Sequence, residues 1–265
     1  MSTDSHRIAA LALHCLDLTS LRDDDTDARI EALAESADTA HGAPAALCVY
    51  PRFIGTARRR LDQLGLARVA IAAVTNFPHG NADSDAAVRE TQAAVAAGAD
   101  EIDVVLPYRA LQAGDSTAAS TLVASCRAAC DAGVKPVRLK VILETGVLMD
   151  APLIRKACEI ALDAGADFLK TSTGKVPVNA TPEAATILLE TIRAHGSHAG
   201  FKAAGGVATL ADAAHYFAIA ERIMGAGWPA PERFRFGASG LLARLLAELD
   251  GGAAASTHQA PAGGY

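Results

Sequence analysis

The stretch Ala97-Gly98-Ala99-Asp100-Glu101-Ile102-Asp103-Val104-Val105 decides the fold class, because it is typical of a helix that ends at a glycine, a short loop and a buried strand. The same order returns in Ala164-Gly165-Ala166-Asp167-Phe168-Leu169-Lys170. A looser copy, Asp131-Ala132-Gly133-Val134, precedes the apolar run at 138–144. A helix-loop-strand unit that repeats in this way predicts an α/β protein with parallel strands.

Eight such strands can be marked along the chain, with ends about 30 residues apart, as expected for successive βα units. Several are apolar on both faces, which a parallel sheet covered by helices requires. Helix starts are predicted at Asp25-Thr26-Asp27, at Thr181-Pro182-Glu183 and at Thr209. We therefore predict a single (β/α)8 TIM barrel, with a doubly wound sheet as the alternative. The predicted strands are residues 13–19, 46–50, 69–75, 101–106, 138–144, 168–172, 200–204 and 234–238.

The length of 265 residues fits one such barrel. The repeating pattern stops near residue 250, and the remaining residues are rich in glycine, alanine and serine. We assign residues 1–250 to the barrel domain and residues 251–265 to a flexible C-terminal tail that ends in Tyr265.

Composition argues against several classes of protein. The net charge is −6 and the one dense basic run is Arg58-Arg59-Arg60, so nucleic acid is not an expected partner. No apolar stretch reaches the roughly 20 residues of a membrane span. Residues 1–7 lack a basic segment followed by a long apolar one, so we do not expect secretion. The five cysteines form no Cys-x-x-Cys pair, which is typical of a reduced, cytoplasmic protein. The eight histidines include no pair spaced for a metal, so we expect no metal and no other cofactor.

The lysines have an unusual distribution. Three of the six, Lys140, Lys170 and Lys202, lie inside apolar strand-like runs, whereas the chain otherwise prefers arginine and contains 18 of them. Lysine differs from arginine in that it can lose its proton, attack a carbonyl carbon as an amine and form a Schiff base. The pattern therefore predicts a lysine nucleophile. The alternative is that each lysine is a structural residue in a salt bridge.

Residues near the C-terminal ends of barrel strands form the active site of this fold. Lysines on three consecutive strands would be neighbours, and both burial and like charge would lower the pKa of one of them from about 10.4 towards neutrality. A carboxylate such as Asp103 would balance the remaining charge and could move protons. The residues expected at the barrel mouth are Asp17, Cys48, Asp103, Lys140, Lys170 and Lys202.

A second group of residues suggests a phosphate site. Thr171-Ser172-Thr173-Gly174-Lys175, Gly205-Gly206 and Gly237-Ala238-Ser239 follow the strands predicted at 168–172, 200–204 and 234–238. Glycine lets backbone N–H groups approach an anion, and the loops after the last strands of many barrels bind phosphate. The Gly-Lys pair does not form a Walker loop, because Leu169 stands where that motif requires glycine.

Motifs along the chain, in order, are Leu16-Asp17-Leu18-Thr19, Cys48-Val49-Tyr50-Pro51-Arg52, Val74-Thr75-Asn76-Phe77-Pro78-His79-Gly80, Glu101-Ile102-Asp103-Val104-Val105, Leu139-Lys140-Val141-Ile142-Leu143-Glu144-Thr145, Lys170-Thr171-Ser172-Thr173-Gly174-Lys175 and Phe236-Gly237-Ala238-Ser239. In these motifs the chain resembles the deoxyribose-phosphate aldolase family, over nearly its whole length from about residue 8 to the last residue. The resemblance implies a metal-free class I lyase with a (β/α)8 fold, usually a homodimer. Such enzymes reversibly cleave 2-deoxy-D-ribose 5-phosphate to acetaldehyde and D-glyceraldehyde 3-phosphate.

By position in these motifs, Lys170 resembles the Schiff-base lysine, Lys202 the cation that lowers its pKa, and Asp103 the acid/base that works through water. Tyr265 resembles a tail tyrosine that assists proton transfer. The supporting polar residues are Asp17, Lys140, Cys48 and Thr19, and the expected phosphate-binding residues are Thr173, Gly174, Lys175, Gly205, Gly206 and Ser239.

Two positions depart from the family pattern. Ala203 follows Lys202 where the family has proline, and Gly240 follows Ser239 where a second serine is common. The rival functions are a transaldolase-like or keto-acid aldolase, which would use a larger donor than acetaldehyde, and a barrel that binds sugar phosphate without catalysis.

Overall fold

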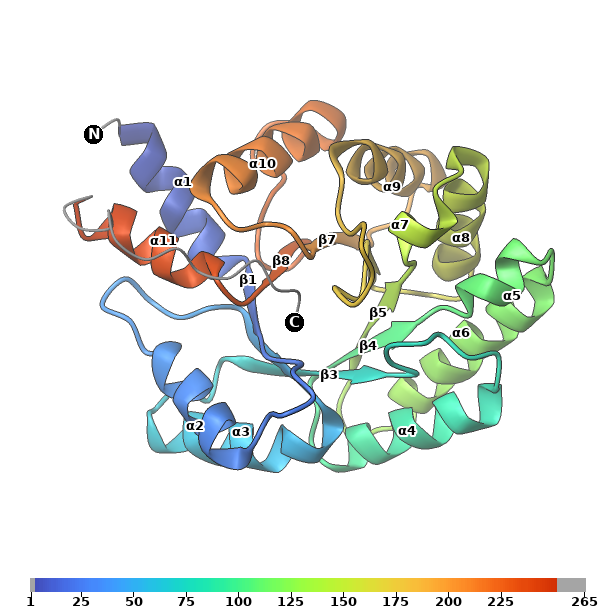
Figure 1. Cartoon of the computed structure of the whole chain (residues 1–265), viewed down its shortest axis with the longest axis horizontal. Coiled ribbons are helices and arrows are strands. Elements are labelled where there is room, and N and C mark those ends of the chain that lie inside the picture. Colours follow the sequence, from blue (N-terminus) through green and yellow to red (C-terminus); the bar gives the residue numbers. More distant parts are fainter. Residues whose placement is uncertain (1–2, 252–265) are drawn as a thin grey trace.

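Eight short parallel strands form a closed barrel in the order in which they occur in the chain, with β8 beside β1 (Figure 1). The computed structural model describes residues 3–251. The prediction of a (β/α)8 TIM barrel is confirmed. A doubly wound sheet is excluded because it has two open edges, whereas here β8 pairs with β1 and closes the sheet. The strands are β1 (Leu16–Thr19), β2 (Ala46–Val49), β3 (Ala70–Thr75), β4 (Glu101–Val105), β5 (Arg138–Ile142), β6 (Phe168–Lys170), β7 (Gly200–Ala204) and β8 (Phe234–Ala238).

Three predicted strands were too long. The strand predicted at 13–19 starts late, because α1 (Thr3–His14) continues through residue 14. β5 ends two residues early, since Glu144 takes a left-handed backbone conformation with φ of 57°. β6 also ends two residues early, because the hydroxyl of Thr171 replaces backbone bonds: it accepts from the amide of Ala204 and donates to its carbonyl. The other strand ends agree with the prediction within one residue.

Helices surround the strands, as Figure 1 shows. The predicted starts are confirmed: Thr26, Thr181 and Thr209 each cap a helix through a side-chain oxygen that accepts a backbone N–H bond. No helix among residues 3–251 is long and apolar enough to cross a membrane. The helices are α1, α2 (Asp27–Ser36), the 3-10 turn η1 (Pro51–Phe53), α3 (Ile54–Gln63), α4 (Ser84–Ala96), α5 (Tyr108–Gln112), α6 (Ser116–Asp131), α7 (Thr145–Leu148), α8 (Ala151–Asp163), α9 (Pro182–His195), α10 (Leu210–Met224) and α11 (Leu241–Leu249).

The inside of the barrel differs from one side to the other. The main hydrophobic core lies between strands and helices, and the outward-facing side chains of every strand contribute to it. Inside the barrel, β2 and β3 contribute a small apolar group that includes Cys48, Ala72 and Val74. The remaining strands point charged side chains inward, and these are almost completely buried. Since buried charges must be paired, this half of the barrel interior is where chemistry is expected.

Candidate functional site

The three lysines that were predicted to converge do so inside the barrel. Lys170 on β6 is the direct pairing neighbour of Lys202 on β7, and Lys140 on β5 is the neighbour of Asp103 on β4. Side chains on these strands alternate, so these four point inward while the residues between them join the outer core. None of the three lysines is more than 2% exposed. Their burial requires an account of their charges.

Asp103 lies at the centre of the lysines. Its Oδ2 accepts from the Nζ atoms of Lys170 and Lys202, each at 2.8 Å. Its Oδ1 lies 2.8 Å from Nζ of Lys140. One carboxylate cannot neutralise three ammonium groups, so the site needs further carboxylates or an uncharged amine.

Two more carboxylates and an arginine complete the site. Nζ of Lys202 lies 2.5 Å from Asp17, and Nζ of Lys140 lies 3.2 Å from Asp17 and 2.5 Å from Glu101. On β8, Arg235 bonds Asp17 at 2.6 Å and the two oxygens of Glu101 at 3.1 and 2.9 Å. We call the following seven residues the buried charge cluster: Asp17, Glu101, Asp103, Lys140, Lys170, Lys202 and Arg235.

The two lysines that share Oδ2 of Asp103 differ in their protonation. Burial lowers the pKa of Lys170, and the positive charge of Lys202 lowers it further against the opposing effect of Asp103. Burial also acts to lower the pKa of Lys202, but Asp103 and Asp17 outweigh it and hold that pKa well above its usual value. The arrangement favours an amine at Lys170 beside an ammonium at Lys202. The uncharged amine is the form that attacks a carbonyl carbon.

Glu101 and Arg235 were not predicted as site residues. The sequence pattern singled out only the lysines, but Arg235 is buried as well and is only 3% exposed. A signal was available, because Arg235 stands between Phe234 and Phe236 in an apolar strand, as the three lysines do in theirs. A charged residue flanked by buried side chains in a barrel strand was informative for arginine as well as for lysine.

Cys48 and Thr19 lie close to the cluster but interact with it weakly. The Sγ atom of Cys48 is 4.0 Å from Oδ2 of Asp103, and burial raises the pKa of this thiol. The hydroxyl of Thr19 donates to the backbone carbonyl of Asp17 at 2.7 Å. Thr19 therefore stabilises the end of β1, and Cys48 fills the apolar side of the barrel.

The loop after β6 is held by a fourth buried carboxylate, that of Glu144. Glu144 accepts from the backbone amide of Thr173 at 3.1 Å and from its hydroxyl at 2.6 Å. The same hydroxyl accepts from the amide of Lys175 at 3.0 Å. Thr173 is thus engaged in shaping the loop, and Gly174 takes a φ of 83° between these two residues. This geometry fixes the backbone of the predicted phosphate loop.

The other predicted phosphate residues lie at the same end of the barrel, because β6, β7 and β8 are neighbours. Gly205 and Gly206 have φ of 79° and 84°, and a Cβ on Gly205 would lie 2.6 Å from Asn179. Ser239 is exposed directly after β8. Nζ of Lys175 lies 3.5 Å from the carboxylate of Asp23 in the loop after β1. Three glycine-containing loops and one lysine can therefore face a common anion.

Ala203 and Gly240, the two positions that depart from the family pattern, lie in the outer core and at the start of a helix. Ala203 is buried in the outer core, and Gly240 is the N-cap of α11 without a side-chain bond. Tyr265 and the tail from residue 252 lie outside the described residues. Within residues 3–251, no three His, Cys, Asp or Glu side chains are grouped as metal ligands.

Comparisons with known proteins show the family and the fold to which this chain is similar. The family model of the DeoC/LacD family aldolases matches residues 11–245. One similar crystal structure is that of a Toxoplasma gondii ME49 protein with proposed deoxyribose-phosphate aldolase activity. Its sequence is 25% identical, the match covers 94% of this chain and 98% of that protein, and the TM-score is 0.86. A crystal structure of a protein from Coccidioides immitis with the same proposed activity is 27% identical. The match covers 91% of this chain and 86% of that protein, with a TM-score of 0.79.

A third structure shares the fold. The deoxyribose phosphate aldolase from Aeropyrum pernix, which is a tetramer, is 23% identical, covers 94% of this chain and 98% of its own, and has a TM-score of 0.71. The family model spans most of the barrel and includes every member of the buried charge cluster. This chain therefore belongs to the DeoC/LacD family of aldolases.

Proposed function

We propose that this aldolase is a class I deoxyribose-phosphate aldolase, which reversibly cleaves 2-deoxy-D-ribose 5-phosphate to acetaldehyde and D-glyceraldehyde 3-phosphate. The observation that carries the proposal is the contact of Lys170 and Lys202 with one oxygen of Asp103, where the pKa of Lys170 is lowered and that of Lys202 is raised. The proposed activity of the similar proteins from Toxoplasma gondii and Coccidioides immitis supports the choice of substrate.

The reaction begins at Lys170. Its uncharged Nζ attacks C1 of the open-chain aldehyde and forms a carbinolamine, and the aldehyde oxygen then leaves as water to give an iminium ion. Lys202, which remains an ammonium, can supply a proton to the departing oxygen. The iminium nitrogen then accepts the electron pair of the bond that breaks next.

Asp103 is suited to the base role in bond cleavage. Burial acts to raise its pKa, but the three lysines outweigh burial and hold the pKa well below its usual value, so the carboxylate is ionised. Through a bridging water it takes the proton of the C3 hydroxyl. The C2–C3 bond breaks, its electrons form an enamine with C1 and C2, and C3 becomes the aldehyde of glyceraldehyde 3-phosphate. Protonation at C2 and hydrolysis release acetaldehyde and free Lys170.

The loops after β6, β7 and β8 are proposed to bind the phosphate. The backbone of Gly174 and Gly206 offers N–H groups without a Cβ in the way, and Lys175 supplies a charge. Gly205, whose N–H donates to the carbonyl of Gly237 at 3.4 Å, would shape the loop at this position. Ser239 would donate its hydroxyl. Tyr265 is proposed to assist protonation at C2. A homodimeric state, a cytoplasmic location and a role in deoxynucleoside catabolism belong to the same proposal.

The proposal is tested by the release of acetaldehyde from 2-deoxyribose 5-phosphate, measured with alcohol dehydrogenase and NADH. We expect turnover by the wild type and by Lys156→Arg, which changes an exposed lysine, and background release by Lys170→Arg. Guanidinium does not form the Schiff base, so near-normal turnover by Lys170→Arg would overturn the assignment.

The acetaldehyde assay, together with other substrates and a binding measurement, separates the rival functions. Cleavage of keto-acid aldols or transaldolase substrates, without cleavage of deoxyribose 5-phosphate, would identify an aldolase with a larger donor. Binding of deoxyribose 5-phosphate in a calorimeter, with no release of acetaldehyde, would identify a binding protein. Our reading requires release of the two-carbon aldehyde.

A further inference from the structure

The charge balance of the buried charge cluster depends on Lys170. Without Lys170, the cluster contains as many carboxylates as cations, and each is at least 97% buried. An ammonium at Lys170 would therefore add an uncompensated positive charge in a place where water does not reach it, which is costly. The carboxylates are Asp17, Glu101 and Asp103, and the cations are Lys140, Lys202 and Arg235.

Arg235 supplies one of the balancing charges at a distance from the proposed nucleophile. Its guanidinium bonds Asp17 and Glu101, and its Nε donates to the carbonyl of Pro231 at 2.5 Å. Lys170 pairs with Lys202, and Lys202 pairs with Arg235, so two strand spacings of about 5 Å separate the backbones of Lys170 and Arg235. Arg235 thus acts on Lys170 through the field of its charge.

We propose that Arg235 and Glu101 are positioning residues for catalysis, which together set the net charge of the cluster and so determine whether Lys170 is an amine or an ammonium at neutral pH. This inference rests on the proposed Schiff-base role of Lys170. It assigns a function to Glu101 and Arg235, which lie near the N-terminal ends of β4 and β8, away from the barrel mouth.

The groups that face Lys170 come from four strands or their ends. Asp103 on β4 and Lys202 on β7 are its nearest charges, and Lys140 on β5 is bonded to the same carboxylate. Cys48 on β2 stays a thiol, because burial raises its pKa. Glu144 follows β5, and burial raises its pKa; both its oxygens are bonded to Thr173. Neither of these last two groups forms an ion pair with a lysine or arginine of the cluster.

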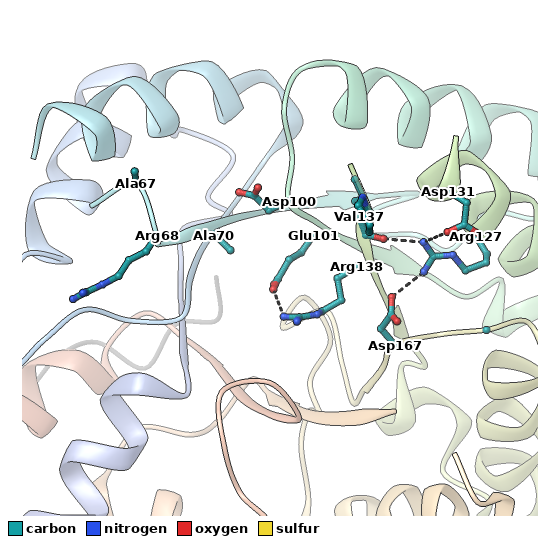
Figure 2. A pocket seen from close by; sticks show the side chains of 12 residues that line it. Ala67, Arg68, Ala70, Asp100, Glu101, Arg127, Asp131, Val137, Arg138 and Asp167 are labelled. Atoms are coloured by element: carbon teal, nitrogen blue, oxygen red, sulfur yellow. Dashed lines mark hydrogen bonds and ion pairs between the residues drawn. The ribbon is translucent and has the colours of Figure 1, made fainter. Parts of the chain in front are cut away.

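The opposite end of the cluster reaches a cavity of about 600 Å³ at the N-terminal ends of β3 to β6, shown in Figure 2. Arg138 lines it and lies 3.0 Å from Glu101, but its side chain is 37% exposed. Solvent therefore screens its charge. Arg127 lines the same cavity and is paired with Asp131 and Asp167 (Figure 2). Arg138 is the matched control for Arg235, since both bond the same carboxylate.

The expected effects have opposite signs. Removing the charge of Arg235 leaves a net negative cluster, which favours an ammonium at Lys170 and moves the pH at which the amine forms upward. Removing the charge of Glu101 leaves a net positive cluster and moves that pH downward. For a charge about 10 Å away at an effective dielectric constant of about 20, each shift is on the order of one pH unit.

The test is the initial rate of adduct formation at Lys170 with acetaldehyde and cyanoborohydride between pH 5 and 9, read by peptide mass spectrometry. The variants are Arg235→Met, Glu101→Gln, the double variant and Arg138→Gln. We expect the pH midpoint of adduct formation to lie about one unit higher for Arg235→Met and about one unit lower for Glu101→Gln. The midpoints of the double variant and of Arg138→Gln should lie close to that of the wild type. Arg235→Lys keeps the charge and should keep the midpoint.

The outcomes separate the two proposals. Wild-type midpoints in both Arg235→Met and Glu101→Gln, or shifts in the same direction, would overturn the positioning role while the adduct itself upholds the Schiff base. Absence of any adduct in the folded wild type would instead overturn the proposed function. If Arg235→Met does not fold, the downward shift of Glu101→Gln and its reversal in the double variant carry the test.

Discussion

Replacing Lys202 with methionine tests why Lys170 is uncharged. The Nζ atoms of both lysines lie 2.8 Å from Oδ2 of Asp103, so they are no more than twice that distance apart. Methionine keeps much of the apolar stem of lysine and removes the charge. Loss of a positive neighbour, together with an Asp103 that has one fewer cation to bond, should raise the pKa of Lys170.

The magnitude follows from the separation of the two charges. At about 5 Å and an effective dielectric constant of about 20, two unit charges repel by about 3 kcal/mol. This energy corresponds to about two pKa units for Lys170. At a pH below both pKa values, the fraction of uncharged amine should therefore fall about a hundredfold.

The assay is the pH dependence of kcat/KM for acetaldehyde release from 2-deoxyribose 5-phosphate. The rising limb of the Lys202→Met profile should lie about two pH units above that of the wild type, and raising the pH should restore part of the lost rate. Lys156→Met removes an exposed lysine and should leave the profile unchanged. A uniform loss of rate at every pH, with an unshifted rising limb, would refute the electrostatic reasoning.

Three further predictions concern the loops and the stability of the barrel. Gly205→Ala should cost about 1–3 kcal/mol of stability and raise KM for the phosphorylated substrate, because its Cβ would lie 2.6 Å from Asn179. Gly206→Ala has a similar φ but no atom within 4 Å, so thermal unfolding should show a smaller loss; equal losses would contradict the clash. Asp23→Asn should lower KM by less than tenfold, since it frees Lys175 from an exposed ion pair, and an unchanged KM would show that this pair does not compete with phosphate. The buried carboxylates of the cluster have folded-state pKa values below their unfolded value of about 4, so their contribution to stability is complete above that pH and is lost as the pH falls. Urea unfolding at pH 7 and pH 3.5 should show this loss, and an equal unfolding free energy at both would contradict it.

The fold was predictable because its signal repeats. The Ala-Gly-Ala-Asp segments before residues 101 and 168 mark the same position in successive βα units, and eight such units leave little choice of architecture. The convergence of Lys140, Lys170 and Lys202 followed from parallel strands in sequence order and from the alternation of side chains along each strand.

Other features of the site depend on contacts that sequence patterns do not encode. The apolar neighbours of Arg235 mark a buried strand, but an arginine there can still extend its guanidinium to the surface, so its ion pairs with Asp17 and Glu101 are known only from the structure. The shape of the loop after β6 depends on bonds between Glu144 and Thr173, which are 29 residues apart. These are long-range interactions, and residue types alone do not show which of the many possible partners each residue contacts.

Reductive trapping tests the central claim most directly. The folded protein would be treated with acetaldehyde and borohydride, digested and mapped by mass spectrometry. The account predicts an ethyl group on Lys170 and none in the Lys170→Arg variant. A stable adduct on Lys140 or Lys202 would contradict the assignment of the nucleophile, and no adduct at all would contradict Schiff-base catalysis by this barrel.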